Sequence, residues 1–355
     1  MNMRSLLNAE TRSLKYMPIG ISKLTSLRTL EKFVVGGGVD GGSTCRLESL
    51  KNLQLLRECR VKGLSNVSHV DEAERLQLYN KKNLLRLGLQ FGRVVDGEGE
   101  EGRRKNEKDE QLLEALQPPL NVEELEIESY RGNIFPKWLN SLTNLRNLYL
   151  SSCFNCEHLP PLGKLPLEKL EIIHLKSVKR VGNEFLGIKE SSEDEPSSSS
   201  SSSSVTAFTK LKSLNIWDME ELEEWNYRIT RKENISIMPR LSSLTVGSCN
   251  KLKALPDYLL QTTALQKLNI NCCENLEELP ILEDHRTTSV VCSLMILDCP
   301  KIKVLPDYLL RTTTLQELTI VGCPLLQEHY REDWHKISHI PHIMVPGLEE
   351  MSELH

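Results

Sequence analysis

One phrase recurs along the chain and constrains its fold more than any other feature. The phrase reads Leu-x-x-Leu-x-Ile/Val-x-x-Cys-x-x-Leu, and its clearest copy runs from Leu241 to Pro256. Further copies begin at Leu265 and Leu315. An apolar pattern that repeats about every 20–29 residues is typical of a leucine-rich repeat solenoid. The repeat therefore predicts a stack of similar units that binds other molecules through a long surface.

The same pattern, in a less regular form, extends over most of the chain and makes about eleven irregular repeats. Strands are expected to start at Leu27, Leu56, Leu84, Val122, Leu145, Leu167, Leu211, Leu241, Leu265, Val291 and Leu315. Alternate residues of a strand face opposite sides of the sheet, so one face of each strand enters the core. We predict an α/β fold: a curved leucine-rich repeat horseshoe, with a parallel β-sheet on the concave face and loops and short helical turns on the convex face.

The convex turns are expected to follow Leu-Pro steps, because proline ends a hydrogen-bonded ladder. After Leu255-Pro256 and Leu305-Pro306, the side chains of Asp257 and Asp307 are placed as N-caps of short helical turns.

The whole chain, residues 1–355, is predicted to form one repeat domain with two polar inserts. The inserts cover about residues 92–110 and 187–205, and the second contains a serine tract from Ser197 to Ser204. Neither has enough apolar residues to offset the entropy of ordering, so both are expected to be surface loops. Phosphorylation of the serine tract is the alternative to a plain linker. About residues 325–355 are expected to form an irregular polar cap over the last strand.

Half of the ten cysteines occupy the ninth position of a repeat, where the turn after the strand needs a small buried side chain. These are Cys153, Cys249, Cys273, Cys299 and Cys323. The alternative is a metal site built from Cys153, Cys156 and His158, or from Cys272 and Cys273, but no second ligand pair follows at zinc spacing. The thiols are expected to stack as a ladder rather than pair, which fits a reducing compartment.

Composition and the missing motifs narrow the class of protein. The net charge of −5 argues against a nucleic-acid partner. No stretch approaches about 18 consecutive apolar residues, so no membrane span is expected. The glycine-rich run Gly36–Gly42 lacks the Gly-Lys-Ser/Thr ending of a phosphate loop. We therefore expect no cofactor, no metal and no enzymatic activity, and a cytoplasmic protein, with the nucleus also compatible.

Several stretches carry a resemblance to a known family. They include Gly20–Gly36, Asp71–Leu84, Val178–Phe185, Met219–Trp225 and Glu332–Pro341. With them the chain resembles the leucine-rich repeat region of plant intracellular disease-resistance proteins, the coiled-coil class of NB-LRR (NLR) immune receptors. The nucleotide-binding (NB-ARC) and coiled-coil domains of that family are absent from this sequence, so a fragment or a naturally truncated product is expected.

The resemblance implies a function in plant defence. In the family, the repeats recognise a pathogen effector or a modified (guarded) host protein, and they keep the nucleotide-binding switch inactive through contacts with the NB-ARC and coiled-coil domains. Two alternatives remain open: a substrate-recruiting repeat adaptor of a ubiquitin ligase, and a truncated or decoy repeat protein without signalling activity. Residues 1–26 are too short to hold the adaptor-binding box that the first alternative needs.

Candidate contact residues are the solvent-facing strand positions of the repeats. They are Glu58, Arg60, Lys62, Glu124, Glu126, Glu128, Asn147, Tyr149, Lys169, Glu171, Trp217, Ser243, Thr245, Lys267, Asn269, Glu317 and Thr319. Tyr149 and Trp217 are the preferred anchors, because aromatic residues dominate interface hot spots. The acidic stripe of Glu124, Glu126 and Glu128 is hypothesised to meet a basic surface, either within a full-length receptor or on a partner.

Overall fold

The computed structural model describes residues 3–11, 13–36, 45–92, 100–188, 205–226, 235–260, 262–280, 290–310 and 313–347. The chain divides into two compact units, Met1–Pro160 and Pro161–His355. The serine tract and residues 37–44, which include most of the glycine-rich run, lie outside the described residues.

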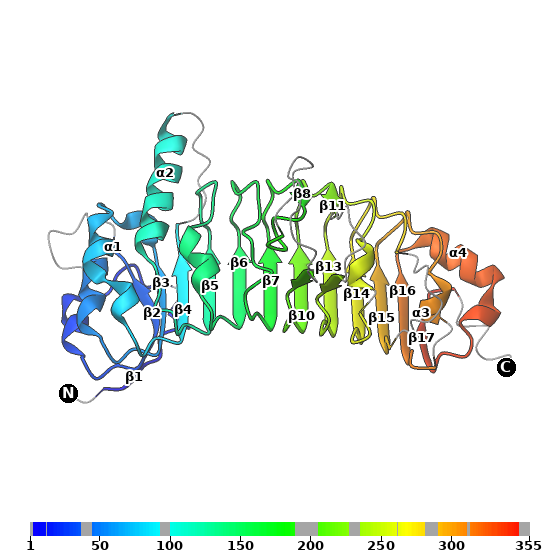
Figure 1. Ribbon diagram of the computed structural model, residues 1–355, viewed down its shortest axis with the longest axis horizontal. Helices are drawn as coiled ribbons and strands as arrows, with labels where there is room; N and C mark the ends of the chain where they lie inside the picture. Colours follow the sequence, from blue (N-terminus) through cyan, green and yellow to red (C-terminus); the bar gives the residue numbers. More distant parts are fainter. Residues whose placement is uncertain are drawn as a thin grey trace, which may run out of the picture. The chain divides into compact units, whose positions relative to one another are not determined.

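The first unit is built on parallel strands that follow one another in chain order (Figure 1). They are β1 (Ser5–Leu6), β2 (Thr29–Val34), β3 (Glu58–Lys62), β4 (Arg86–Gln90), β5 (Glu124–Glu128) and β6 (Asn147–Ser151). From β3 to β6 the register is regular, so that Glu58, Arg86, Glu124 and Asn147 lie side by side. Between β2 and β3 the register shifts after Leu30, which is where the sequence repeat is least regular.

Helical segments connect these strands on the side away from the exposed strand face. They are η1 (Ile19–Lys23), η2 (Leu47–Asn52), η3 (Leu64–Asn66), α1 (Asp71–Leu76), η4 (Leu78–Asn80), α2 (Glu100–Ala115) and η5 (Lys137–Ser141). Lys81 is fully buried next to η2, and its Nζ donates to the carbonyl oxygens of Leu50 at 2.7 Å and Leu53 at 3.0 Å. The ammonium therefore satisfies the carbonyl groups at the end of that short helix.

The prediction of a polar loop over residues 92–110 is wrong for residues 100–110, which form most of helix α2. Figure 1 shows the N-terminal part of α2 projecting beyond the edge of the strands. Its polar composition hides one buried stripe of Asp109, Leu112 and Leu113. Ion pairs one helical turn apart, such as Lys105–Glu101 at 2.7 Å, support the exposed part of the helix. The helix was missed because a count of polar residues does not detect the helical spacing of these buried residues and ion pairs.

The second unit repeats the arrangement with more regular strands (Figure 1). They are β7 (Lys169–Ile173), β10 (Ser213–Trp217), β13 (Ser243–Gly247), β14 (Lys267–Asn271), β15 (Ser293–Leu297), β16 (Glu317–Val321) and β17 (His342–Met344). Each strand pairs in parallel with the next, and β7 to β16 keep one register without a shift. The insert predicted at 187–205 lies almost wholly outside the described residues.

Short elements cover the opposite side of the second unit. They are β8 (Arg180–Val181), β11 (Glu224–Trp225), β9 (Val205–Ala207), β12 (Ile235–Ile237), η6 (Asp257–Leu259), α3 (Asp307–Leu310), α4 (Pro324–Glu332) and η7 (Trp334–Lys336). Strands β8 and β11 form one small parallel sheet, and β9 and β12 form another. Helical turns follow both Leu-Pro steps as predicted. The N-cap prediction is wrong at Asp257, because Pro256 is the cap residue and no side chain caps that turn.

Each of the eleven predicted starts is followed two residues later by a strand of the main ladder, from β2 to β16. Strands β1 and β17 flank these and were not predicted. The prediction of an irregular cap at 325–355 is wrong in part, because α4 and β17 are regular and β17 pairs with β16. Residues 348–355 lie outside the described residues.

The core consists of ladders of aliphatic side chains from the second and fourth residue of each strand. Leu125, Ile127, Leu148 and Leu150 are fully buried in the first unit, and their counterparts in the second unit are equally buried. Burial of a leucine or isoleucine side chain stabilises the fold by about 1.5–3 kcal/mol. This repeated burial confirms the predicted leucine-rich repeat solenoid.

The chain turns sharply after each regular strand, with one residue in the left-handed region. His174, Asp218, Ser248, Cys272 and Asp298 hold φ values from 49° to 57° there, although none is glycine. The amide of each donates to the next strand; for example, Asp218 N donates to the carbonyl oxygen of Gly247 at 2.9 Å. This hydrogen bond to the neighbouring repeat offsets the backbone strain.

The residue after each of these turns enters the core, which is where the sequence placed the ninth-position cysteines. Cys153, Cys249, Cys273, Cys299 and Cys323 are fully buried and unpaired with one another as disulfides. The Sγ of Cys249 donates to the carbonyl oxygen of Gly247 at 3.4 Å. Burial raises the pKa of Cys153 and of Cys249 to about 12. The prediction that these five cysteines fill a buried position after the strand is confirmed.

Candidate protein-interaction surfaces

All the candidate contact residues lie on the solvent-facing side of their strands, half-buried or exposed. We call this side of β2–β6 the first strand face, and this side of β7, β10 and β13–β17 the second strand face. The alternation of strand side chains places these residues, because the residues between them enter the core. Each face belongs to one unit.

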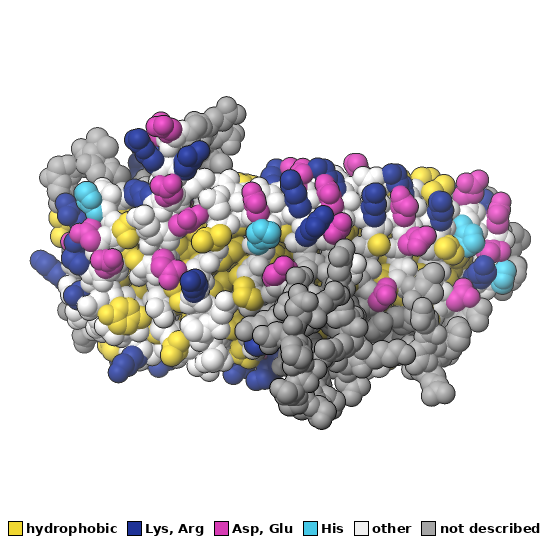
Figure 2. All heavy atoms as spheres, turned by 45° about the horizontal axis from the view of Figure 1, so that its top comes forward, with side chains coloured by type: hydrophobic (Ala, Val, Ile, Leu, Met, Phe, Trp, Pro, Cys, Tyr) yellow, Lys and Arg dark blue, Asp and Glu magenta, His cyan; other side chains and the backbone are white. Residues whose placement is uncertain are grey.

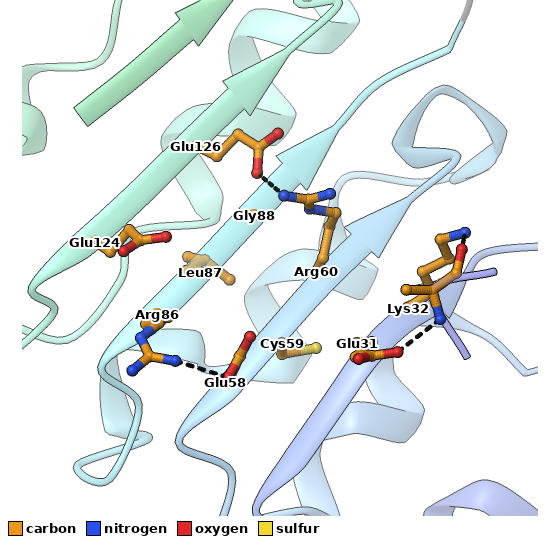
Figure 3. A pocket seen from close by; sticks show the side chains of 11 residues that line it. Glu31, Lys32, Glu58, Cys59, Arg60, Arg86, Leu87, Gly88, Glu124 and Glu126 are labelled. Carbon is orange, nitrogen blue, oxygen red and sulfur yellow. Dashed lines mark hydrogen bonds and ion pairs between the residues drawn. The ribbon is translucent and has the colours of Figure 1, made fainter. Parts of the chain in front are cut away.

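Oppositely charged side chains from neighbouring strands meet on the first strand face (Figure 3). Arg86 Nη1 lies 3.0 Å from Glu58 Oε2, across one strand boundary. Arg60 reaches further, over β4, and its Nη2 forms an ion pair with Glu126. Asn147 Nδ2 donates to Glu124 Oε2 at 3.3 Å. Three separate pairs of polar side chains therefore connect residues of four strands, β3 to β6, on this face.

Gly88 makes the long reach of Arg60 possible. A Cβ atom at residue 88 would lie 2.8 Å from Cγ and 3.1 Å from Nε of Arg60. Because the glycine has no side chain, the arginine lies flat over β4, as Figure 3 shows. A hollow of about 200 Å³ opens here, with four carboxylates and three cationic side chains in its lining. Arg86 and Gly88 were not among the predicted site residues, although the strand alternation places both on this face.

The hypothesis of an acidic stripe at Glu124, Glu126 and Glu128 needs correction. The middle carboxylate, Glu126, is already compensated by Arg60 of the same chain. Desolvation nevertheless raises the pKa of Glu126, while Arg60 opposes the rise. Desolvation lowers the pKa of Lys62, and the charge of Glu128 acts against that shift. The face is therefore a mixed ion-pair network rather than a uniform acidic stripe.

The second strand face is mostly uncharged. Between Glu171 and Met344, its middle row consists of four uncharged polar residues and one methionine: Asn215, Thr245, Asn269, Met295 and Thr319. Charge is confined to its two ends and one central position. Lys169 Nζ pairs with Glu171 Oε1 at 2.7 Å on β7, Lys267 is exposed on β14, and Glu317 is exposed on β16.

Trp217 is the main aromatic side chain of the second face. A Cβ atom at residue 247 would lie 2.3 Å from two carbon atoms of the Trp217 ring, so the indole lies flat over Gly247. Gly247 occupies a solvent-facing position of its strand but is buried beneath this ring. Half-buried apolar residues continue the same row at Ile173, Leu297 and Val321. They were missed because an apolar residue in a repeat is normally assigned to the core.

The edge that follows the strands of the second unit is charged, in contrast to its face. Lys176 pairs with Glu220, and Lys251 Nζ lies 2.6 Å from Glu221 Oε2. Figure 2 shows basic and acidic side chains alternating along this edge. Both ion pairs are solvent-exposed, so each adds little stability. They give the mostly uncharged face a polar border along this edge, and polar borders are usual at protein interfaces.

We also searched the described residues for a metal site and for a membrane-spanning helix. No group of three or more His, Cys, Asp or Glu side chains in that part of the chain is placed to hold a metal ion. No helix in the described ranges is long and apolar enough to cross a membrane.

Known protein families match the chain over its central part. Residues 47–178 match the family described as R13L1/DRL21 LRRs. Residues 119–274 match the family of RPS2-like plant disease resistance protein leucine-rich repeats. Both descriptions agree with the strand ladder and the buried leucine rows.

Curated relatives agree with these families. The chain is 32% identical over 282 residues to the disease resistance protein RGA2 of Solanum bulbocastanum, covering 72% of this chain and 27% of that protein. It is 33% identical over 246 residues to the putative disease resistance protein At3g14460 of Arabidopsis thaliana, covering 67% of this chain and 16% of that protein. This chain thus spans about a quarter or less of the length of these relatives. The chain is a leucine-rich repeat region of the plant disease-resistance (NLR) type.

Proposed function

We propose that this repeat region recognises a protein partner through its second strand face, and that the partner is a pathogen effector or a host protein that an effector has modified. The observation that carries the proposal is the indole of Trp217, held flat over Gly247 within a mostly uncharged face that charged side chains border along one edge. A large aromatic ring at the centre of an apolar patch is the usual composition of an interface hot spot.

We further propose that the repeats restrain a nucleotide-binding switch inside the cell, as the family resemblance implies. The first strand face suits this contact, because an ion-pair network gives orientation and specificity more than affinity. Arg60 and Glu58 are exposed there and remain accessible to a charged partner surface. The partners of this contact are the NB-ARC and coiled-coil domains of a full-length receptor.

A chimeric receptor tests both parts of the proposal. The repeat region of RGA2 is replaced by this chain, and the chimera is expressed in leaves with and without candidate effectors. Quiescence without effector and cell death with one effector are the expected results. Trp217→Ala is expected to abolish the response to effector while leaving the chimera quiescent. Arg60→Glu is expected to cause cell death without effector.

Matched variants on the opposite side of the repeats serve as controls. Tyr79 is exposed on η4 and Arg103 is exposed on α2, so Tyr79→Ala and Arg103→Glu change similar chemistry away from both faces. If the Trp217→Ala chimera causes the same cell death with effector as the Tyr79→Ala chimera, recognition through the second face is contradicted. Quiescence of Arg60→Glu contradicts the restraint through the first face.

A further inference from the structure

A second recessed surface lies in the first unit, away from its strand face. Helix α2, the residues around α1 and the segment after β5 enclose a hollow of about 770 Å³. None of the residues that line it belongs to the solvent-facing rows of the strands. Ile134 is 66% exposed at its edge. Phe135, Val70 and Ala115 extend this apolar surface, and all three are half-buried.

The hollow has rigid walls, because the segment after β5 is tied to α2 at three points. Arg131 Nε lies 2.8 Å from Oδ2 of the buried Asp109, and Nη2 lies 3.1 Å from Oδ1. The backbone amide of Asn133 donates to Glu110 Oε1 at 2.6 Å. The indole of Trp138 donates to the carbonyl oxygen of Leu113 at 3.1 Å. A bidentate, buried ion pair and two hydrogen bonds hold the two walls together.

The floor of the hollow is also held in place. The hydroxyl of Tyr130 donates to the carbonyl oxygen of Ile134 at 2.6 Å, which fixes the loop that presents Ile134. The rings of Tyr130 and Phe135 pack with their centroids 5.8 Å apart. A partner therefore meets a preformed surface and has little protein entropy to overcome there.

Charge around the hollow is strongly one-sided. Its lining contains three carboxylates, Glu74, Glu110 and Glu114, and a single cation, Lys137. Glu74 and Glu114 are exposed and form no ion pair with any residue in the described part of the chain. Carboxylates beside an apolar recess attract a ligand that carries cationic and apolar groups together. An amphipathic basic peptide has this combination.

We propose that this hollow is a docking site for a basic, amphipathic segment of a partner protein. An aliphatic side chain of that segment packs against Ile134 and Phe135, while flanking lysine or arginine side chains pair with Glu74 and Glu114. The volume lies in the range of about 300–1,000 Å³ that binding pockets occupy, which suits one or two side chains of a peptide. The site is separate from the strand faces, so it does not depend on the function proposed for them.

Fluorescence anisotropy with a defined probe tests the proposal on the full chain. The probe is a fluorescein-labelled nonapeptide that alternates lysine with leucine. The comparison peptide has glutamine in place of every lysine. We expect the basic peptide to bind, and to bind more weakly as sodium chloride is raised from about 50 to 500 mM, because salt screens exposed charges. The glutamine peptide is expected to bind at least about tenfold more weakly.

Two charge reversals on one helix supply the matched control. Glu114 and Glu107 are both exposed on α2, but only Glu114 lines the hollow. Glu114→Lys is expected to weaken the basic peptide about tenfold, and Glu107→Lys less than about threefold. Ile134→Ser is expected to weaken it as well, since the aliphatic contact is lost.

Equal binding of the basic peptide to Glu114→Lys and Glu107→Lys overturns the proposal, as does equal binding of the two peptides to the parent chain. Failure of the parent chain to bind the basic peptide also overturns it. Circular dichroism melting curves of Glu114→Lys, Glu107→Lys and Ile134→Ser are compared with the curve of the parent chain. Matching curves show that any loss of binding is measured on folded protein.

Discussion

Gly88 in the first strand face and Gly247 in the second lie beneath a long side chain from the preceding strand. Arg60 crosses Gly88 and ends in an ion pair with Glu126. Trp217 lies over Gly247 and covers it with its ring. The same absence of a Cβ atom thus permits a charged network in one unit and a flat aromatic patch in the other.

The difference matters for binding. Exposed ion pairs contribute about 0–1 kcal/mol each and are screened by salt, so the first face favours orientation and selectivity. A flat aromatic ring offers a large contact area at low entropic cost, so the second face favours affinity. A repeat scaffold allows this division because its buried positions leave the solvent-facing positions free to vary.

The largest expected effect concerns the buried thiols of the second unit. Cys249 and Cys299 have pKa values near 12, the first because of burial and the second because of hydrogen bonding with Cys273 as well as burial. Both thiols stay protonated in the folded chain while they ionise in the unfolded chain near pH 9. Their contribution to stability is therefore complete below pH 9 and is lost between about pH 9 and pH 12, by about 1.4 kcal/mol per pH unit for each thiol.

Urea unfolding from pH 8 to pH 10.5 measures this loss. The double variant Cys249→Ala/Cys299→Ala is expected to be less stable at pH 8, because it leaves cavities, and to show a shallower decline above pH 9. A decline as steep as that of the parent contradicts the assignment to these thiols.

The buried Lys81 of the first unit is expected to have the opposite pH dependence. Burial lowers its pKa to about 8 from an ordinary value of 10.5. Between these two values the unfolded chain binds more protons than the folded chain, so this group's contribution raises stability by up to about 1.4 kcal/mol per pH unit as the pH increases. The contribution is lost as the pH falls through 8. Lys81→Met is expected to make the parent's alkaline decline steeper over this window, and an unchanged slope contradicts the lowered pKa.

A pair of glycine substitutions tests the two faces directly. Gly247→Ala places a Cβ atom 2.3 Å from the Trp217 ring, and Gly88→Ala places one 2.8 Å from Cγ of Arg60. A rigid ring packed between neighbours gives way less readily than an exposed, flexible arginine. We expect a destabilisation of about 1–3 kcal/mol for Gly247→Ala and less than about 1 kcal/mol for Gly88→Ala. Chemical denaturation measures both, and tryptophan emission reports the displaced indole. Equal costs contradict the distinction.

The smallest expected effect is the loss of the ion pair on the first face. Arg60→Met keeps much of the aliphatic length and removes the charge, so the destabilisation is expected to be below about 1 kcal/mol. The pKa of Glu126 is already raised by burial and is expected to rise further without Arg60. NMR titration of the glutamate carboxyl carbons measures this shift, and Arg86→Met, which leaves Arg60 in place, is the control.

The positions of the strands and their outward residues were predictable because both depend on local alternation. Eleven strands begin two residues after the starts that the leucine pattern predicts, and every predicted contact residue faces solvent. Helix α2 was missed because its polar composition resembles that of a loop. The burial of Asp109 on this helix depends on its ion pair with Arg131, which lies outside the helix and could not be paired with it from a local pattern.

Taken by itself, the sequence determined the repeat, the family and the buried slot of the cysteines, because each depends on local sequence patterns within single repeats and their connections. Only the tertiary structure decided which side chains of different repeats meet within each unit. Arg60 and Glu126 are 66 residues apart in the chain, and they meet because parallel strands in register align the same positions of different repeats. The covering of Gly88 and Gly247 and the hollow beside α2 have the same origin, because neighbouring repeats bring together residues that no local pattern connects.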